Sequence, residues 1–422
     1  MNFEHEEMAE IVQDVNQSPN IKWSWEFADG REQWLGLGCF ATLYFRSGTA
    51  RQARDKAHIV VDCIDRFNAM IGNKFVTGKH PDSSRPHPFS GKRLPQDWHA
   101  YTENYHDGSL TNINYGFTSE KAITDSPEFA LSSKVRLANN TEDYNNLRFD
   151  FTLTWWRSQQ VAFGRFLRET ARQLGAEQGY MGLGFARPLD LGASADIEGL
   201  EYQLAQHFYG LDIEQPFWNG FENSKTRGLP LGGMRPLVWA GLVGGPWLQK
   251  LGGADALVNA LRHDAHPAIR TEVLNPDQVW IEVGDEPQIH PVTEPVPADL
   301  AFVAKVMRPA RGEELSLSGM ARWDDDDDMV FTPTESRRWL KRFDDDSDWP
   351  TPEIRQPPQT PEAPSRTATL SALPGEPCPK DGLWFAPHLG MKEVNMRQGD
   401  PMPSMDEAGR SGSVIWYWKA PS

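Results

Sequence analysis

Residues 34–45 read WLGLGCFATLYF, an apolar and aromatic run with glycine breaks. Such a run is typical of a buried strand. Ser47 and Thr49 follow with hydroxyl groups that can cap the first turn of a helix. Apolar residues then recur at helical spacing, at Ala53, Ala57, Val60, Val61, Ile64, Phe67 and Ile71. The stretch therefore predicts a strand followed by an amphipathic helix that packs on it.

A second unit of the same kind begins near residue 149. Residues 149–155 (FDFTLTW) alternate apolar and polar side chains, which predicts a half-buried strand. Apolar residues at helical spacing over 162–174 predict a helix, and Gly175 is a natural residue to end it. Residues 180–186 return as a strand.

A third unit follows a short apolar run at 237–243. Residues 247–261 carry a helical apolar stripe, although the double glycine at 252–253 must kink or interrupt it. Residues 271–274 and 279–283 predict two strands of a hairpin around an Asn-Pro-Asp turn.

The repeated order of strand, helix and strand predicts the α+β class, with mixed sheets packed against amphipathic helices. We place this core at residues 21–322, after a polar N-terminal tail at 1–20. Residues 78–145 are rich in Pro, Ser, Asn and Asp, and we interpret them as loops and edge strands. The pattern is compatible with two related sheet layers, and it leaves the strand order open.

The character of the chain changes at Trp323. Residues 323–370 contain two acidic runs and a proline-rich stretch, which predicts an extended linker. Residues 371–422 contain two aromatic strand-like runs and predict a small β-rich module. A module of this size buries little surface, so we expect it to dock on something.

The chain has 422 residues, a formal charge of -17 and a pI near 5.1. An acidic surface argues against direct nucleic-acid binding, which requires basic side chains facing phosphate. It suits a basic partner protein, although solubility alone is the commoner reason for such a charge.

Three cysteines, Cys39, Cys63 and Cys378, lie far apart and suggest neither a disulfide framework nor a zinc site. The acidic start lacks the features of a signal peptide, and no apolar run has the length of a membrane span. We expect a cytoplasmic protein without membrane contact.

The catalytic motifs that a sequence can display are absent here, whereas a pair of carboxylates for hydrolysis depends on the fold and stays open, with no particular pair favoured. There is no phosphate-binding glycine loop and no GxSxG nucleophile turn. His263 and His266 lack the partners of a zinc site, and consecutive aspartates do not match a calcium loop. The sequence predicts a protein that is not an enzyme and holds no cofactor or metal.

Four segments carry a family resemblance. These are GLDIE at 210–214, GLPLGGMRPLVWAGLVGGPWLQKLGG at 228–253, VWIEVGDEP at 279–287, and the helical stretch at 297–311. Their order resembles the type VI secretion immunity family known for VRR-NUC nucleases. The C-terminal residues 375–384 and 397–403, with Trp416, resemble the tail of the immunity protein 71/72 type.

The resemblance implies an immunity protein that binds a cognate toxin of the nuclease class and occludes its active site without turnover. The alternative is an accessory or adaptor protein for a type VI effector, and a carbohydrate-active enzyme is a distant third. Two sets of side chains are candidates for toxin contact. The alternative for the aspartates is that they are simply solvated, and the alternative for the tryptophans is that they pack in a core. They are Asp324, Asp325, Asp326, Asp327, Asp328, Asp344, Asp345 and Asp346, and Trp384, Trp416 and Trp418.

Overall fold

The computed structural model describes residues 5–18, 21–26, 32–79, 85–89, 112–136, 144–214, 232–312, 331–350, 371–372, 375–386, 392–403 and 416–420. The chain divides into two compact units, Met1–Gln356 and Pro357–Ser422. Each unit is described by itself.

Unit 1 contains both helices and strands. The described helices are α1 (His5–Gln17), α2 (Ala50–Met70), α4 (Leu153–Leu174), α5 (Leu191–Asp196), α6 (Glu198–Ala205), α9 (Gly245–Lys250), α10 (Ala254–Leu261), α11 (Ala298–Met307), the 3-10 helix η1 (Arg308–Ala310) and α12 (Pro333–Leu340). The described strands are β1 (Lys22–Glu26), β2 (Glu32–Arg46), β3 (Thr77–Lys79), β4 (Pro86–Pro88), β5 (Asn112–Thr118), β6 (Ala130–Arg136), β7 (Tyr144–Phe151), β8 (Gln178–Phe185), β9 (Ala240–Gly244), β10 (Ile269–Asn275) and β11 (Gln278–Val283).

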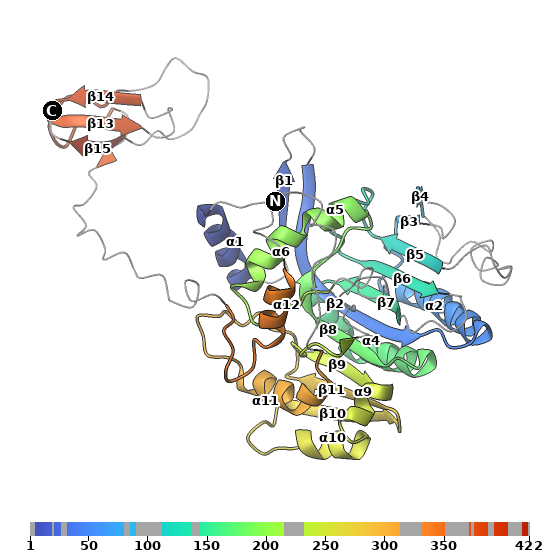
Figure 1. The fold of residues 1–422 in the computed structure, drawn as a ribbon. Coiled ribbons are helices and arrows are strands. Elements are labelled where there is room, and N and C mark those ends of the chain that lie inside the picture. The colour runs from blue at the N-terminus through green and yellow to red at the C-terminus, as the bar shows by residue number, and fades with distance from the viewer. Residues whose placement is uncertain are drawn as a thin grey trace. The chain divides into compact units, whose positions relative to one another are not determined.

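These strands form one 11-stranded sheet in the order β10-β11-β9-β8-β2-β7-β6-β5-β3-β4, with β1 paired to β2 (Figure 1). All pairings between these strands are antiparallel. The α+β class is confirmed. The sequence is compatible with two sheet layers, but the structure has a single continuous sheet. Strand β8 pairs with both β2 and β9 and so joins the strands of the three predicted segments.

The predicted strand and helix at the start of the core are both present, as β2 and α2. Thr49 caps α2, and its side chain accepts a hydrogen bond from the backbone N–H of Gln52. The Gln52 side chain in turn accepts one from the Thr49 backbone N–H, at 2.8 Å. This reciprocal pair satisfies two N–H groups that a helix start otherwise leaves free.

The segment of β7 and α4 differs from its sequence pattern in two ways. The alternation through residue 155 predicts a strand to that point, but β7 ends at Phe151 and Thr152 caps α4, its hydroxyl accepting from the Trp155 N–H at 3.2 Å. The polar face of β7 is also buried, with Arg148 and Asp150 each 2% exposed. The strand ends early because Thr152 caps a helix, and the polar face is buried because the segment that bears Glu214 covers this strand.

One face of the sheet is covered by α2 and α4 (Figure 1). Aromatic rings fill the space between these helices and the central strands. Phe163 of α4 lies 4.8 Å from Phe151 and 5.8 Å from Phe149, and Phe67 of α2 lies 5.0 Å from Phe149, in edge-on contacts. Such contacts add to the stabilisation from burial alone.

The opposite face carries two further apolar clusters. Helices α9, α10 and α11 pack on one, and α1, α6 and α12 contribute to the other. The double glycine at 252–253 separates α9 from α10, as its sequence predicts, and both glycines have positive φ values of 85° and 91°. The hairpin predicted from 271 to 283 is present as β10 and β11.

Three segments contain helices or strands that their sequence patterns do not predict. The segment taken as a polar tail contains α1, whose Met8, Ile11 and Val15 are buried at helical spacing. The segment taken as linker contains α12, and its Trp339 is fully buried in unit 1. Within the stretch taken as loops, β5 and β6 lie inside the sheet. In each segment a few apolar residues pack among many polar ones.

Unit 2 contains a four-stranded sheet in the order β12-β15-β13-β14. Its strands are β12 (Ser371–Ala372), β13 (Gly382–Ala386), β14 (Lys392–Met396) and β15 (Trp416–Ala420). The described buried core of this unit is Ala372, Cys378, Trp384 and Met402. Among the described helices of the whole chain, none is long and apolar enough to cross a membrane.

Candidate functional site

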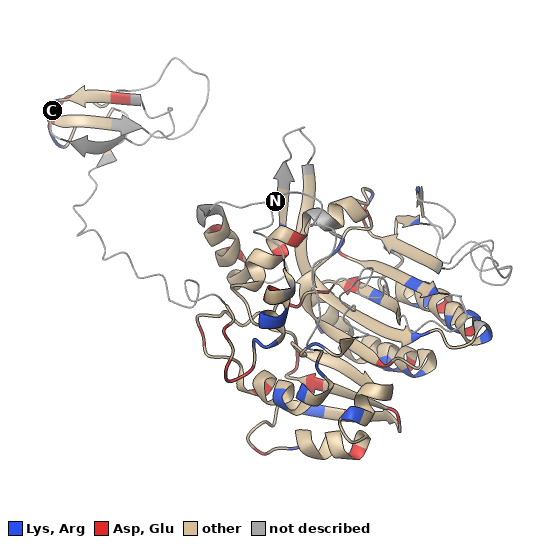
Figure 2. Cartoon of the chain, viewed as in Figure 1, with Lys and Arg blue, Asp and Glu red and all other residues tan. Residues whose placement is uncertain are grey.

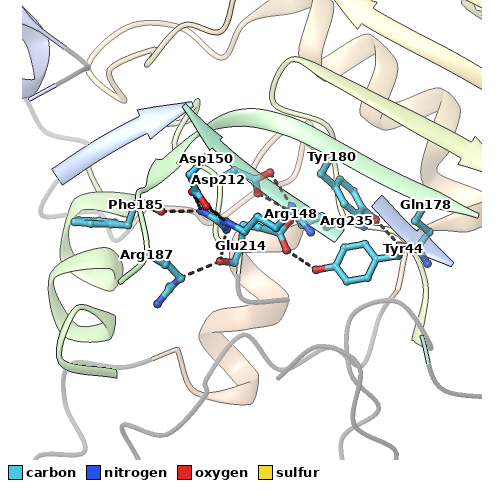
Figure 3. Close-up of polar contacts among 10 residues, drawn as sticks. All are labelled: Tyr44, Arg148, Asp150, Gln178, Tyr180, Phe185, Arg187, Asp212, Glu214 and Arg235. Carbon is cyan, nitrogen blue, oxygen red and sulfur yellow. Dashed lines mark hydrogen bonds and ion pairs between the residues drawn. The ribbon is translucent and has the colours of Figure 1, made fainter. Parts of the chain in front are cut away.

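A network of charged side chains lies buried on the face of the sheet opposite α2 and α4 (Figure 3). Strands β2, β7 and β8 supply part of it, and two segments that pass over them supply the rest. A Cβ atom on Gly184 of β8 would lie 3.0 Å from the Asp212 carbonyl oxygen. Glycine at this position therefore lets the segment that carries Asp212 and Glu214 approach the strand closely.

Arg235 is the centre of this network. Its guanidinium donates to the two carboxylate oxygens of Asp212 at 2.9 and 3.0 Å and to the carboxylate of Glu214. It also stacks on the Tyr180 ring, 3.6 Å from the ring centroid. All three charged side chains are at most 1% exposed.

Two further arginines hold the backbone around Glu214. Arg148 forms a two-pronged contact with Asp150 and donates to the Glu214 carbonyl oxygen at 3.0 Å. Arg187 donates to the same carbonyl oxygen at 3.0 Å and pairs with Glu201. The Glu214 backbone is thus tied to β7 and to the segment after β8.

Burial raises the pKa of the Glu214 carboxyl, and the positive charges of Arg235 and Arg148 oppose this shift. Burial likewise raises the pKa of Asp150 against the effect of Arg148. Tyr44 also donates a hydrogen bond to Glu214. With nearly every atom shielded from solvent, the network cannot meet a substrate or partner directly, and its chemistry is that of a structural brace.

The brace explains two of the sequence segments quoted above. Asp212 and Glu214 belong to GLDIE, and Arg235 belongs to the GMRP part of the next segment. In the same motif, a Cβ on Gly210 would clash with the Gln288 carbonyl oxygen. The sequence does not predict this charged network. Charged residues in an alternating strand are ordinarily solvated, and only the fold brings together β7, the segment after β8, residues 212–214 and Arg235.

A groove lies on the other face of the sheet, between α4 and the β10–β11 hairpin. Its volume is about 620 Å³. Helix α4 lines it with Trp156, Gln160, Val161, Arg165, Arg168 and Arg172. The opposite side and the floor consist of Trp239, Arg270, Glu272, Glu282 and Asp285.

Ion pairs connect the two walls of this groove. Arg168 of α4 contacts Glu272 of β10 at 3.0 Å and also pairs with Glu282 of β11. At one end Arg157 binds both carboxylate oxygens of Glu286 at 2.7 Å. The Trp156 and Trp239 rings lie 5.0 Å apart in an edge-on contact, and both are buried. Val161 and Arg165 are exposed, unlike the side chains of the buried brace.

The comparison with family models identifies the chain. The model described as "Type VI immunity for VRR-NUC" matches residues 59–343, more than half of the sequence. This chain belongs to that family. Among curated protein sequences, none matches it significantly.

A solved structure titled "Pseudomonas aeruginosa T6SS protein PA0821" has the same fold as this type VI immunity chain. The TM-score is 0.62 at 18% sequence identity, over 81% of this chain and 91% of the other. At this identity the likeness concerns the fold alone. The family match ends at residue 343, so the resemblance of the C-terminal tail to the 71/72 type stays a prediction.

The acidic toxin-contact candidates of this immunity chain lie in different environments. Asp324–Asp328 fall outside the described residues. Asp344 pairs with Arg311 through two contacts of 2.7 Å, and both side chains are 5% exposed. Asp345 and Asp346 are exposed. A role in steering a toxin stays a prediction, and it suits Asp345 and Asp346 better than the paired Asp344.

The tryptophan candidates all belong to unit 2. Trp384 is fully buried, and its indole N–H donates to the Lys380 carbonyl oxygen at 3.0 Å. Trp416 and Trp418 lie on β15, and their side chains are outside the described part. Trp384 is therefore a core residue of this unit, and its role in toxin contact stays a prediction.

The described residues contain no group of three or more His, Cys, Asp and Glu side chains arranged to hold a metal ion. His266 pairs with Asp299 at 2.7 Å and stacks on Phe302, with ring centroids 4.3 Å apart. His263 lies 5.5 Å from His266, also ring to ring. These histidines pack helix α11 against the segment after α10.

Proposed function

We propose that this chain is an immunity protein that binds a cognate type VI secretion toxin of the nuclease class and neutralises it by covering its active site. The observation that carries the proposal is the family match over residues 59–343. The family implies a non-enzymatic role for the chain and a VRR-NUC toxin as its partner.

Physical features support a binding role. The formal charge of -17 attracts the basic cleft with which a nuclease holds its substrate. The braced sheet supplies a rigid framework, and rigid surfaces lose less conformational entropy when they bind. Inhibition then needs only a stable complex placed over the cleft.

Two experiments test this proposal. Cells that express the toxin from the adjacent gene should stop growing, and co-expression of this chain should restore growth. In a purified system, nuclease activity should fall in proportion to added chain and vanish at equal amounts, as expected of stoichiometric inhibition. An unrelated nuclease serves as the control and should keep its activity.

The proposal is wrong if the chain neither binds the toxin nor restores growth. Loss of growth together with increased secretion of the toxin would support the adaptor alternative instead. Turnover of a substrate by the purified chain would contradict both.

A further inference from the structure

Helix α4 has a charge pattern unlike that of the chain as a whole. It contains four arginines and a single acidic residue, Glu169, whereas the full sequence has 59 acidic and 42 basic residues. Arg157, Val161, Arg165, Arg168 and Arg172 follow one another at intervals of three or four residues, so they share one face of the helix. Figure 2 shows basic positions on α4, and positions of both charges on the neighbouring helix α2. The arginine face borders the groove described above.

Among the described residues that line the groove, one arginine has no acidic partner. Its lining holds four arginines and three acidic residues. Glu272, Glu282 and Asp285 are each paired with an arginine of the groove. Arg165 is exposed and forms no hydrogen bond or ion pair with the described residues. A carboxylate from another molecule is the group that would complete this arrangement.

The apolar part of the groove adjoins this cation. Val161, one turn before Arg165, is 76% exposed, the highest exposure among the large apolar side chains described as exposed. Trp156 and Trp239 also line the groove, but they are only 6% and 2% exposed, so Val161 is the apolar side chain of the lining that is open to a partner. Arginine is among the residue types that contribute most binding energy at protein interfaces.

We propose that the groove between α4 and the β10–β11 hairpin receives a segment of the toxin that presents a carboxylate to Arg165 and an apolar side chain to Val161. This inference rests on the proposed function and names the contact surface. The overall negative charge draws a basic partner toward the chain, whereas the local positive charge of the groove accepts an acidic side chain of that partner. The two effects together set the orientation of the complex.

The test uses the full-length chain and a catalytically inactive form of the cognate toxin, with the dissociation constant measured by biolayer interferometry. Arg165→Glu should raise the dissociation constant about tenfold or more, because the charge then repels the incoming carboxylate. Arg165→Gln should have a smaller effect in the same direction. The matched control is Arg51→Glu on α2, another exposed arginine without a partner among the described residues, and it should bind as the wild type does.

Arg165 has no hydrogen-bond or ion-pair partner among the residues that the structure describes, so the variants should keep the circular dichroism spectrum and thermal midpoint of the wild type. An unchanged dissociation constant for both Arg165 variants, with normal binding by the wild type, overturns the groove as the contact surface and leaves the proposed function standing. Failure of the wild-type chain itself to bind the toxin overturns the proposed function. If Arg51→Glu weakens binding as much as Arg165→Glu, general charge and not the groove carries the effect, and the inference is also wrong.

Discussion

Replacing Arg235 with leucine is expected to destabilise unit 1 by about 3–5 kcal/mol. The guanidinium of Arg235 is fully buried and donates to both oxygens of Asp212 and to Glu214. The substitution leaves two buried carboxylates close together without their main counter-charge. An uncompensated buried charge costs more than the lost hydrogen bonds alone, which is why the expected value exceeds that of a typical point mutation.

The cost should depend on pH. Burial raises the pKa of Glu214, and Arg235 opposes that shift, so removing Arg235 raises the folded-state pKa further above the ordinary value of 4.5. The folded variant then binds more protons than the unfolded chain at any pH between the two pKa values. Its stability relative to wild type falls as pH rises above about 4.5 and recovers as pH is lowered toward that value.

The assay is urea unfolding of the full chain, followed by tryptophan fluorescence at about pH 5 and about pH 8. A matched variant adds Asp212→Asn and Glu214→Gln to Arg235→Leu, which removes the uncompensated charges and should recover part of the loss at pH 8. The exposed control Arg51→Leu should change the free energy of unfolding by less than about 0.5 kcal/mol. A loss below about 1 kcal/mol for Arg235→Leu, or a loss that is the same at both pH values, would refute the assignment of this network as a buried charged brace.

Other substitutions test other parts of the structure. Thr49→Ala should destabilise unit 1 by about 1 kcal/mol, because it removes one half of the capping box of α2, and Thr49→Ser should restore most of this in the same unfolding assay. Cys39 and Cys63 are buried and burial raises the pKa of each thiol, to about 12 for Cys63, so iodoacetamide should label them in urea but not in the native chain; rapid native labelling would contradict their burial. Asp345→Asn with Asp346→Asn should slow association with the toxin mainly at low salt and leave stability unchanged, whereas Asp344→Asn should cost about 3 kcal/mol of stability by breaking its buried pair with Arg311.

Local features of the sequence predicted the local elements. The capped helix after residues 34–45, the glycine that ends α4 at residue 175, and the interruption of the helical stripe at 252–253 are all present. Each depends on residues within a few positions of one another: a hydroxyl at a helix start, a residue that tolerates positive φ, or a repeat of apolar side chains. The quoted family segments also pointed to the family that the comparison shows.

Longer-range features could not be predicted in this way. The sequence pattern of β7 predicts a half-buried strand, yet Arg148 and Asp150 are covered because the segment bearing Glu214 crosses them. The sequence of helix α1 predicts a polar tail, because its apolar residues in the core are a stripe of Met8, Ile11 and Val15 among polar ones. The groove depends on β10 and α4, which are about a hundred residues apart in the sequence.

The sequence by itself determined which helices and strands occur, and in what order, in the well-patterned segments; it also determined the α+β class and the family. The tertiary structure alone decided that one sheet spans unit 1, that Asp212, Glu214 and Arg235 meet in its interior, and that Arg165 has no partner among the described residues beside a groove. The physical reason is that backbone propensity acts between near neighbours, whereas burial and charge pairing depend on which distant segments the fold brings into contact.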